Sequence, residues 1–438
     1  MIQDWLEKIE SKSAVVGIVG LGYVGLPLCR AFHAAGYSVI GYDVDSEKIE
    51  RLNAGQNYLM HLGEDFVREM VEAGRFEATA DFSRFGEADA ILICVPTPLG
   101  EHLEPDLSFV EKSTEAVTNT LRAGQLVVLE STTFPGTTRN VMLPSLESKG
   151  KKCGPDFLLA YSPEREDPGR LDFSTQTIPK LVGGIDEASG KVAHALYESA
   201  FKKVIRVSQA EVAESAKLLE NIYRSINIAM VNELKIILTA MGIDIWEVID
   251  AAATKPFGFQ AFYPGPGLGG HCIPIDPYYL SWQAREIGQP TRFIELAGEI
   301  NHSMPAYVVN RVALALNNRR KSVKGSRILI LGLAYKPDVD DVRESPSLEL
   351  IVRLKKLGAL IDYNDPHIPA THRMRNYDLG MQSVELTTES MAAYDCIVVA
   401  THHKAYDWQH IADHAQLIVD TRGALRTVTG SRDHIVNA

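Results

Sequence analysis

The chain has 438 residues, 45% of them hydrophobic and 23% charged, so it is long enough for two or three domains with sizeable cores. A formal net charge of -12 argues against nucleic acid as a partner, because phosphate backbones bind to basic faces. The apolar runs fall short of the ~20 residues that span a bilayer, and MIQDWLEKIESK lacks a signal peptide's apolar core, so we expect no membrane insertion. Five cysteines without a C-x-x-C pair predict a reducing, cytoplasmic location.

Two stretches of the chain predict the same α/β architecture. The first has the strand AVVGIVG, the turn GLGYVG, a helix near 27–35, the strand YSVIGYDVD and two later apolar runs, ADAILICVPTP and GQLVVLESTT. The second has the strand SRILILGLAYKP, the helix SLELIVRLKKLG and the strands ALIDYNDP, DCIVVATHH and QLIVDTRG. Short apolar runs that alternate with helices indicate parallel sheets. We therefore expect an α/β protein with two Rossmann-like, doubly wound domains.

A helical region separates the two stretches. Residues 211–241 contain no Gly or Pro and repeat apolar residues at helical spacing, which predicts one long helix that bridges domains or subunits. A second helix is expected over 305–318. We place the first Rossmann domain at 1–208, a central helical and dimerisation domain at 209–320, and the second Rossmann-like domain at 321–438. The long helix makes a homodimer or a higher homo-oligomer the expected assembly.

The turn after the first strand has the glycine spacing of a dinucleotide-binding site. Gly20 permits the tight turn, Gly22 lets a pyrophosphate approach the backbone, and Gly25 lets the helix pack on the strand. The helix N-terminus then offers backbone N–H groups to phosphate oxygens. We expect the whole turn, including Tyr23 and Val24, to bind the cofactor.

Polar residues at the ends of neighbouring strands extend this site. Asp43 ends the second strand, where a carboxylate binds the ribose 2′-hydroxyl and repels a 2′-phosphate, so NAD is favoured over NADP. Thr97 and Thr132 follow two further strands, and ligands bind at the carboxyl ends of such strands. We expect both threonines at the cofactor, and Thr132 among the catalytic residues as well. Simple capping of their loops is the alternative.

The second α/β stretch lacks the glycine pattern, so a second dinucleotide is not expected there. Its first strand leads into KPDVDDVRES, which contains Lys336 and Arg343. Two cations on such a loop suit a phosphate-bearing ligand. A salt bridge with Asp338, Asp340 or Asp341 is the alternative.

The segment PGPGLGGHCIPIDPYYL places Cys272 after a run of glycines and prolines that allow close approach of a ligand. A thiol and a nicotinamide cofactor in one chain predict an oxidation through a covalent thioester. By this route a single enzyme can take an alcohol to a carboxylic acid.

Seven motifs in this order make the chain similar to the UDP-glucose and GDP-mannose dehydrogenase superfamily, the UDP-sugar 6-dehydrogenases. They are GLGYVGLP, VPTP, ESTTFPGT, SPER, AKLLEN, GGHCIPIDP and LGLAYKPDVDDVRESP, and they cover nearly the full length. The form GPGLGGHCIPIDPYYL most resembles the UDP-N-acetylglucosamine branch of bacterial O-antigen, lipopolysaccharide and capsule synthesis. The resemblance implies that UDP binds to the C-terminal domain, with Lys336 and Arg343 on the phosphates.

The resemblance also implies the catalytic roles. Cys272 matches the family nucleophile. Lys217 and Asn221, four residues apart on the long helix, would bind the substrate and stabilise the oxyanion. Glu164 would bind the substrate and serve hydrolysis of the thioester, and Asp276 would organise a water that acts as base.

Some features leave alternatives open. Ile275 stands where the glucose enzymes carry lysine, so UDP-glucose is less favoured than an N-acetylhexosamine; UDP-N-acetylmannosamine and UDP-N-acetylgalactosamine stay possible. Either Glu166 or Asp167 could supplement Glu164. His271 is interpreted as packing or a ground-state contact, and the remaining histidines show no metal spacing, so no metal is expected. A two-electron 3-hydroxyacid dehydrogenase and a non-catalytic nucleotide-sugar sensor are the rival functions.

Overall fold

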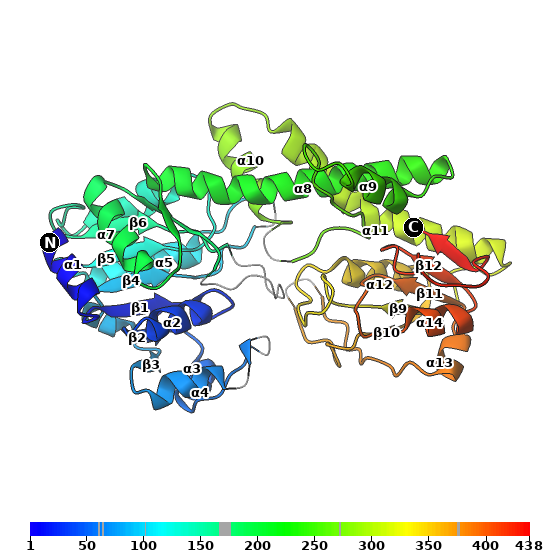
Figure 1. The fold of residues 1–438 in the computed structure, drawn as a ribbon, viewed down its shortest axis with the longest axis horizontal. Helices are drawn as coiled ribbons and strands as arrows, with labels where there is room; N and C mark the ends of the chain where they lie inside the picture. Colours follow the sequence, from blue (N-terminus) through cyan, green and yellow to red (C-terminus); the bar gives the residue numbers. More distant parts are fainter. Residues whose placement is uncertain (60–61, 64, 101, 166–176, 271–272, 375–376) are drawn as a thin grey trace. The chain divides into compact units, whose positions relative to one another are not determined.

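The computed structural model describes residues 1–59, 62–63, 65–100, 102–165, 177–270, 273–374 and 377–438 (Figure 1). It divides into two compact units, each made of two stretches of chain. The first unit is Met1–Glu220 with Tyr278–Gln289, and the second is Asn221–Pro277 with Pro290–Ala438. Each unit contains one sheet, as the two α/β stretches of the sequence predict.

The sheet of the first unit has the strand order β3-β2-β1-β4-β5-β6-β7-β8. Its neighbours pair in parallel except β6 and β7, which are antiparallel. The order of strands reverses at β1, so the ends of β1 and β4 form the switch point where open α/β sheets bind ligands. The strands are β1 (Val15–Val19), β2 (Ser38–Tyr42), β3 (Phe76–Thr79), β4 (Ala90–Ile93), β5 (Leu126–Leu129), β6 (Leu158–Tyr161), β7 (Lys180–Gly184) and β8 (Val204–Arg206).

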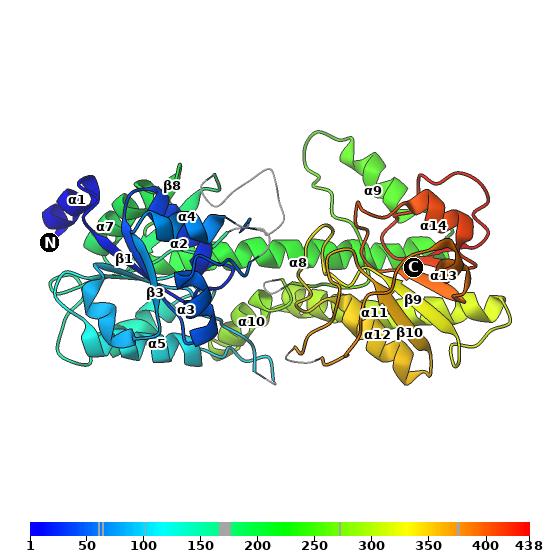
Figure 2. The ribbon, with the colours of Figure 1, turned by 90° about the horizontal axis from the view of Figure 1, so that it is seen from below.

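Helices cover both faces of this sheet (Figure 2). Successive strand residues point to opposite faces, so Val16 and Ile18 of β1 pack in one core and Val19 packs in the other. The first core includes α1 (Ile2–Glu10), α2 (Gly25–Ala34), α3 (Ser46–Asn53), α4 (Phe66–Glu72) and α7 (Glu187–Glu198). The second includes the 3-10 helix η2 (Phe82–Glu87), α5 (Ser108–Thr120), the π-helix η3 (Thr138–Met142) and α6 (Leu143–Glu147).

The sheet of the second unit is parallel throughout, with the order β10-β9-β11-β12-β13. One face packs on α11 and α12, and the other on α13 and α14. The strands are β9 (Arg327–Leu331), β10 (Leu360–Asn364), β11 (Cys396–Val399), β12 (Ile418–Asp420) and β13 (Ile435–Asn437). The helices are α9 (Ile245–Ala253), α11 (Arg292–Asn318), α12 (Pro346–Lys356), α13 (Thr388–Ala392) and α14 (Trp408–His414).

Two helices contribute residues to both units: α8 (Ala210–Ala240) and α10 (Asp276–Glu286). The first confirms the long helix expected over 211–241. The expected start of the later helix at Pro305 is wrong, because α11 begins at Arg292 and Pro305 lies inside it. Proline favours the first turn of a helix and costs about 3 kcal/mol in its interior, and the packing of buried neighbours such as Met304 and Val308 offsets that cost here. Within the described residues, no helix is both long and apolar enough to cross a membrane.

Candidate active site

Local packing explains two of the three glycines in the turn between β1 and α2. Gly20 has a φ of +88°, and a Cβ atom there would lie 2.7 Å from the Cys94 carbonyl oxygen. A Cβ atom on Gly25 would lie 1.9 Å from the Gly20 carbonyl oxygen. Gly22 differs, because a Cβ atom there would meet no atom within 4 Å. The fold thus requires Gly20 and Gly25, whereas Gly22 borders open space.

The start of α2 suits an anionic ligand. The helix begins after Val24, and in the described part of the chain no side chain caps it. Gly22, Tyr23 and Val24 are partly exposed, while most of the helix that follows is buried. An uncapped helix start directs backbone N–H groups and a positive dipole end outward. Together with the open space at Gly22, these groups fit the pyrophosphate of a dinucleotide.

Asp43 lies directly after β2, beside this turn. One carboxylate oxygen accepts a hydrogen bond from the Leu21 N–H at 2.9 Å, and the other accepts from the Asp45 N–H at 3.0 Å. The residue is only 8% exposed, so its orientation is fixed. A carboxylate has about four acceptor positions, and these two bonds leave capacity for a ribose hydroxyl.

Thr97 and Thr132 come together at the ends of β4 and β5. The Thr97 hydroxyl donates to the Thr132 carbonyl oxygen at 2.8 Å, so it does cap the adjoining loop. The Tyr279 hydroxyl of α10 donates in turn to the Thr97 carbonyl oxygen. On the Thr132 loop, Phe134 packs against Trp282 of α10, with 5.2 Å between ring centroids. Both loops are therefore fixed by α10, a contact that the sequence did not reveal.

Glu164 follows β6, and the described part of the chain supplies two donors to its carboxylate. Its Oε1 atom accepts from the Arg165 N–H at 2.6 Å, and its Oε2 atom accepts from the Lys180 ammonium at 3.0 Å. The Arg165 guanidinium pairs with Glu220 of α8 at 2.6 Å. This ion pair ties the Glu164 segment to the helix that also carries Lys217 and Asn221.

Lys217 and Asn221 lie one turn apart on α8, and both are buried, at 7% and 3% exposure. Within the described part of the chain, the Lys217 ammonium has no hydrogen-bond or ion-pair partner. The Asn221 amide donates to the carboxylate of Asp276, the first residue of α10. A cation on a mostly buried side chain that has no partner among the described residues is suited to bind an oxygen of a ligand.

The glycines before the cysteine segment pack against the loop that follows β9. A Cβ atom on Gly269 would lie 2.5 Å from the Tyr335 Cβ atom, and one on Gly270 would lie 2.9 Å from its ring. The Gly270 N–H also donates to the Arg343 carbonyl oxygen at 2.9 Å. Larger side chains would separate the two segments. The candidates Cys272, His271, Glu166 and Asp167 lie outside the described residues.

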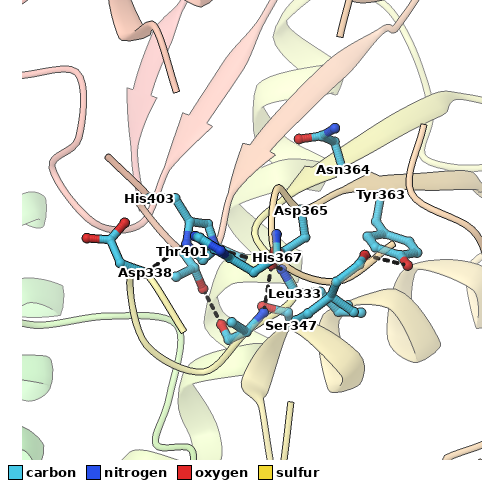
Figure 3. A network of polar contacts seen from close by, with 12 residues as sticks. Leu333, Asp338, Ser347, Tyr363, Asn364, Asp365, His367, Thr401 and His403 are labelled. Atoms are coloured by element: carbon cyan, nitrogen blue, oxygen red, sulfur yellow. Dashed lines mark hydrogen bonds and ion pairs between the residues drawn. The ribbon is translucent and has the colours of Figure 1, made fainter. Parts of the chain in front are cut away.

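A buried hydrogen-bond network fixes the loop after β9 (Figure 3). The Asp365 carboxylate accepts from the N–H groups of Leu333 and Ala334 at 2.6 and 3.0 Å and lies 3.1 Å from His403 Nε2. His403 Nδ1 accepts from the Asp338 N–H at 2.9 Å, which places the imidazole proton on Nε2, facing Asp365. Asp365 thus takes the position that Asp43 has in the first unit, but protein groups occupy its carboxylate.

Asp338, His367 and His403 bring potential metal ligands within 4.8 Å of one another. Both nitrogens of His403 are engaged by the bonds just described. A cation at His403 would have to break one of them. The group is therefore better described as the hydrogen-bonded core of the loop.

Arg343 pairs with Asp341 at the end of the same loop. Its Nε atom lies 3.0 Å from one carboxylate oxygen and its Nη2 atom lies 2.6 Å from the other. Asp341 is buried, and the Arg343 side chain is 37% exposed. The salt bridge considered from sequence is thus present, and contact of Lys336 and Arg343 with a ligand stays a prediction.

Comparisons with known proteins agree with this arrangement. Models of the UDP-glucose/GDP-mannose dehydrogenase family match at 14–201 for the NAD binding domain, 211–303 for the central domain and 329–427 for the UDP binding domain. The chain is 35% identical to UDP-N-acetyl-D-glucosamine 6-dehydrogenase of Pseudomonas aeruginosa, over 90% of this chain and 92% of the relative. It is 33% identical to UDP-N-acetyl-D-mannosamine dehydrogenase of Pyrococcus horikoshii, over 94% and 96%. A solved UDP-D-ManNAc dehydrogenase structure from P. horikoshii matches with a TM-score of 0.87 and 31% identity, over 97% of this chain and 98% of that one.

Two Rossmann-like sheets, a dinucleotide turn in the first and a UDP binding domain in the second define an NAD-dependent nucleotide-sugar dehydrogenase. The chain belongs to the UDP-glucose/GDP-mannose dehydrogenase family. The fold class, the NAD cofactor and the class of enzyme expected from the sequence are confirmed.

Proposed function

We propose that the chain catalyses the four-electron oxidation of the C6 hydroxyl of a UDP-N-acetylhexosamine to the uronic acid, with UDP-N-acetylglucosamine as the first candidate. The observation that carries this proposal is the Lys217 ammonium, which has no partner among the described residues although its side chain is mostly buried; it lies one turn from the Asn221–Asp276 contact. A cation and an amide on one side of a helix can bind one developing oxyanion.

Each candidate residue has one role in this proposal. NAD, when bound, supplies the hydride acceptor. A water held by Asp276 takes the C6 hydroxyl proton as a hydride leaves C6, which gives the aldehyde, and Lys217 and Asn221 stabilise the oxyanion. The Cys272 thiolate adds to the aldehyde carbon, and loss of a second hydride converts the thiohemiacetal to a thioester. A water that gives its proton to Glu164 then releases the acid and restores the thiol.

The cofactor and the nucleotide are assigned to separate residues. We propose that the turn from Gly20 to Gly25 binds the pyrophosphate, that Asp43 binds the ribose, and that Thr97 and Thr132 line the cofactor site. Lys336 and Arg343 bind the UDP phosphates, which requires Arg343 to share its charge with Asp341. In this proposal residues 1–208 bind NAD, residues 209–320 form the central helical domain, and residues 321–438 bind the UDP-sugar.

The hexose and the biological setting are the finer parts of the proposal. Ile275 in place of the lysine of glucose enzymes favours an N-acetylhexosamine. The relatives are named for N-acetylglucosamine, N-acetylmannosamine and N-acetylgalactosaminuronic acid, so UDP-N-acetylmannosamine and UDP-N-acetylgalactosamine are the nearest alternatives, ahead of UDP-glucose. We further propose a cytoplasmic homodimer that makes a precursor of surface polysaccharide, either O-antigen or capsule.

A panel of UDP-sugars, assayed by NADH absorbance and by product mass, tests this proposal. We expect UDP-N-acetylglucosamine to give two NADH and one uronic acid per sugar, because the thioester route oxidises C6 twice. One NADH with a released aldehyde would overturn the mechanism and favour a two-electron enzyme. Turnover of UDP-glucose alone would overturn the choice of sugar, and binding without any turnover would support a sensor.

Matched variants of the cysteine test the covalent step. We expect Cys272→Ala to bind NAD and UDP-sugar but to form no acid, since no thiohemiacetal can form. We expect Cys272→Ser to stall as an ester, which hydrolyses more slowly than a thioester. Full acid production by the alanine variant would exclude Cys272 as the nucleophile.

A further inference from the structure

A buried ion cluster in the first unit joins three strand ends. Lys180, the first residue of β7, donates to Glu130 after β5 at 2.7 Å and to Glu164 after β6 at 3.0 Å. The Lys180 and Glu130 side chains are 3% and 0% exposed, and that of Glu164 is 13% exposed. The Tyr197 hydroxyl of α7 donates to the second oxygen of Glu130. One ammonium therefore serves two carboxylates away from water.

The charges of the cluster are unequal. Burial acts to lower the pKa of Lys180, but the two carboxylates outweigh it and hold that pKa above its usual value. Burial raises the pKa of Glu130 to about 7, although Lys180 opposes this. Cys94 after β4 and Tyr197 also face the cluster, and burial keeps both neutral by raising their pKa values. Lys180 is thus always charged, whereas the charge of its partner Glu130 depends on pH.

The geometry at Glu164 is that of an oriented carboxylate. Lys180 donates to Oε2 and the Arg165 N–H donates to Oε1, so both oxygens have a donor. The Arg165 guanidinium is itself fixed by the Pro179 carbonyl oxygen at 2.7 Å and by Glu220. A nearby cation and hydrogen bonds from donors both favour the ionised form of a carboxyl group. A proton acceptor needs this form before it can take a proton from water.

We propose that Lys180 is a positioning residue for hydrolysis of the thioester: it fixes the Glu164 carboxylate in its ionised form, and Glu130 shares the same ammonium. This inference rests on the proposed function only for the role of Glu164 in hydrolysis. The effect of Lys180 on Glu164 is a property of the first unit and can be measured without substrate.

Carboxyl carbon NMR of protein labelled with carbon-13 at glutamate tests the electrostatic part. The Glu164 signal is assigned by its loss in Glu164→Gln. In Lys180→Met we expect its titration midpoint to rise by about one to three pH units, because the cation is lost. In Lys180→Arg the midpoint stays close to that of the unmodified protein. An unchanged midpoint in Lys180→Met overturns the proposal.

Glu130→Gln is a control that keeps the ammonium in place. Burial raises the pKa of Glu130 to about 7, so this carboxyl group is already neutral at the lower pH where an ion-paired glutamate titrates, and we expect the Glu164 midpoint in this variant to stay close to that of the unmodified protein. A merely structural role of the cluster would instead move the midpoint in both variants alike. If Lys180→Met does not fold, Lys180→Gln is titrated in its place, and an unchanged Glu164 midpoint there overturns the proposal.

Rapid-quench kinetics with UDP-N-acetylglucosamine and NAD test the catalytic part. In Lys180→Met we expect the first NADH to form at the rate of the unmodified protein, while release of the acid slows by at least about tenfold. Lys180→Arg should restore acid release. Equal slowing of both steps would assign Lys180 a structural role only. If no UDP-sugar is oxidised, the proposed function fails, but the NMR titration still decides what Lys180 does to Glu164.

Discussion

Gly22 and Gly25 form a matched pair for separating cofactor binding from folding. An added Cβ atom at Gly25 would lie 1.9 Å from the Gly20 carbonyl oxygen, where contacts below 3.0 Å essentially never occur. The obstacle is backbone, so the turn itself must open by about 1 Å in Gly25→Ala, which we expect to cost about 1–3 kcal/mol. For a unit of this size, that corresponds to a fall in Tm of roughly 2–12 °C.

Gly22→Ala should behave in the opposite way. An added Cβ atom there meets no atom within 4 Å, so we expect a Tm within about 1 °C of the unmodified protein. The methyl group would occupy the space assigned to the pyrophosphate. Loss of one charge-assisted contact costs roughly 1.5–3 kcal/mol, which corresponds to an increase in the Kd for NAD of about ten- to a hundredfold.

Differential scanning fluorimetry and calorimetric titration with NAD measure both quantities on the same samples. NAD binding by Gly22→Ala as tight as that of the unmodified protein would refute the placement of the pyrophosphate at Gly22. A Tm of Gly22→Ala as low as that of Gly25→Ala would refute the open space at Gly22.

Three further predictions follow from single residues. Asp43→Ala should reduce the preference for NAD over NADP by a larger factor than it lowers kcat at saturating NAD, as measured by steady-state kinetics with both cofactors. Equal use of NAD and NADP by the unmodified enzyme would contradict the placement of Asp43 at the ribose. Arg343→Ala should raise the KM for the sugar nucleotide by about ten- to a hundredfold, from the loss of roughly 1.5–3 kcal/mol, and weaker NAD binding instead would place Arg343 at the other site. Burial lowers the pKa of Lys235 to about 7, so the unfolded chain binds more protons between pH 7 and pH 10, and stability rises with pH there. The free energy of unfolding, measured with urea, should therefore rise with pH in this window more steeply for the unmodified protein than for Lys235→Met, by up to about 1.4 kcal/mol per pH unit. Equal slopes for the two proteins would count against a lowered pKa of Lys235.

Features that depend on local spacing could be predicted from the sequence. The glycine turn and Asp43 lie within one strand–helix–strand stretch, and the absence of Gly and Pro over 211–241 defined α8 to within a residue at each end. Thr97 and Thr132 meet because β4 and β5 are neighbours in the sheet, which the order of elements already favoured.

Features that depend on distant packing could not be predicted. Lys180 stands just before an apolar run, a position where a lysine is usually exposed to solvent, so its burial could not be read from the sequence. Its partner Glu130 lies 50 residues earlier. The contact exists because β7 runs antiparallel to β6, a departure from the parallel pattern that no local signal announced. The partner of Arg343 stayed open for a related reason: several aspartates neighbour it in sequence, and only the folded loop selects Asp341.

The contacts of α10 have a consequence for biosynthesis. The first unit includes Tyr278–Gln289, whose Tyr279 and Trp282 cover Thr97 and Phe134. Once residues 1–208 have left the ribosome, they contain every strand of this sheet but leave the Phe134 ring uncovered and the Thr97 carbonyl oxygen without its donor. At about 5–20 residues per second, the ribosome needs roughly 4–16 s more to deliver residue 289. During this interval the first unit exposes apolar surface that α10 later covers. Chaperone binding and aggregation at this surface would compete with completion of the fold.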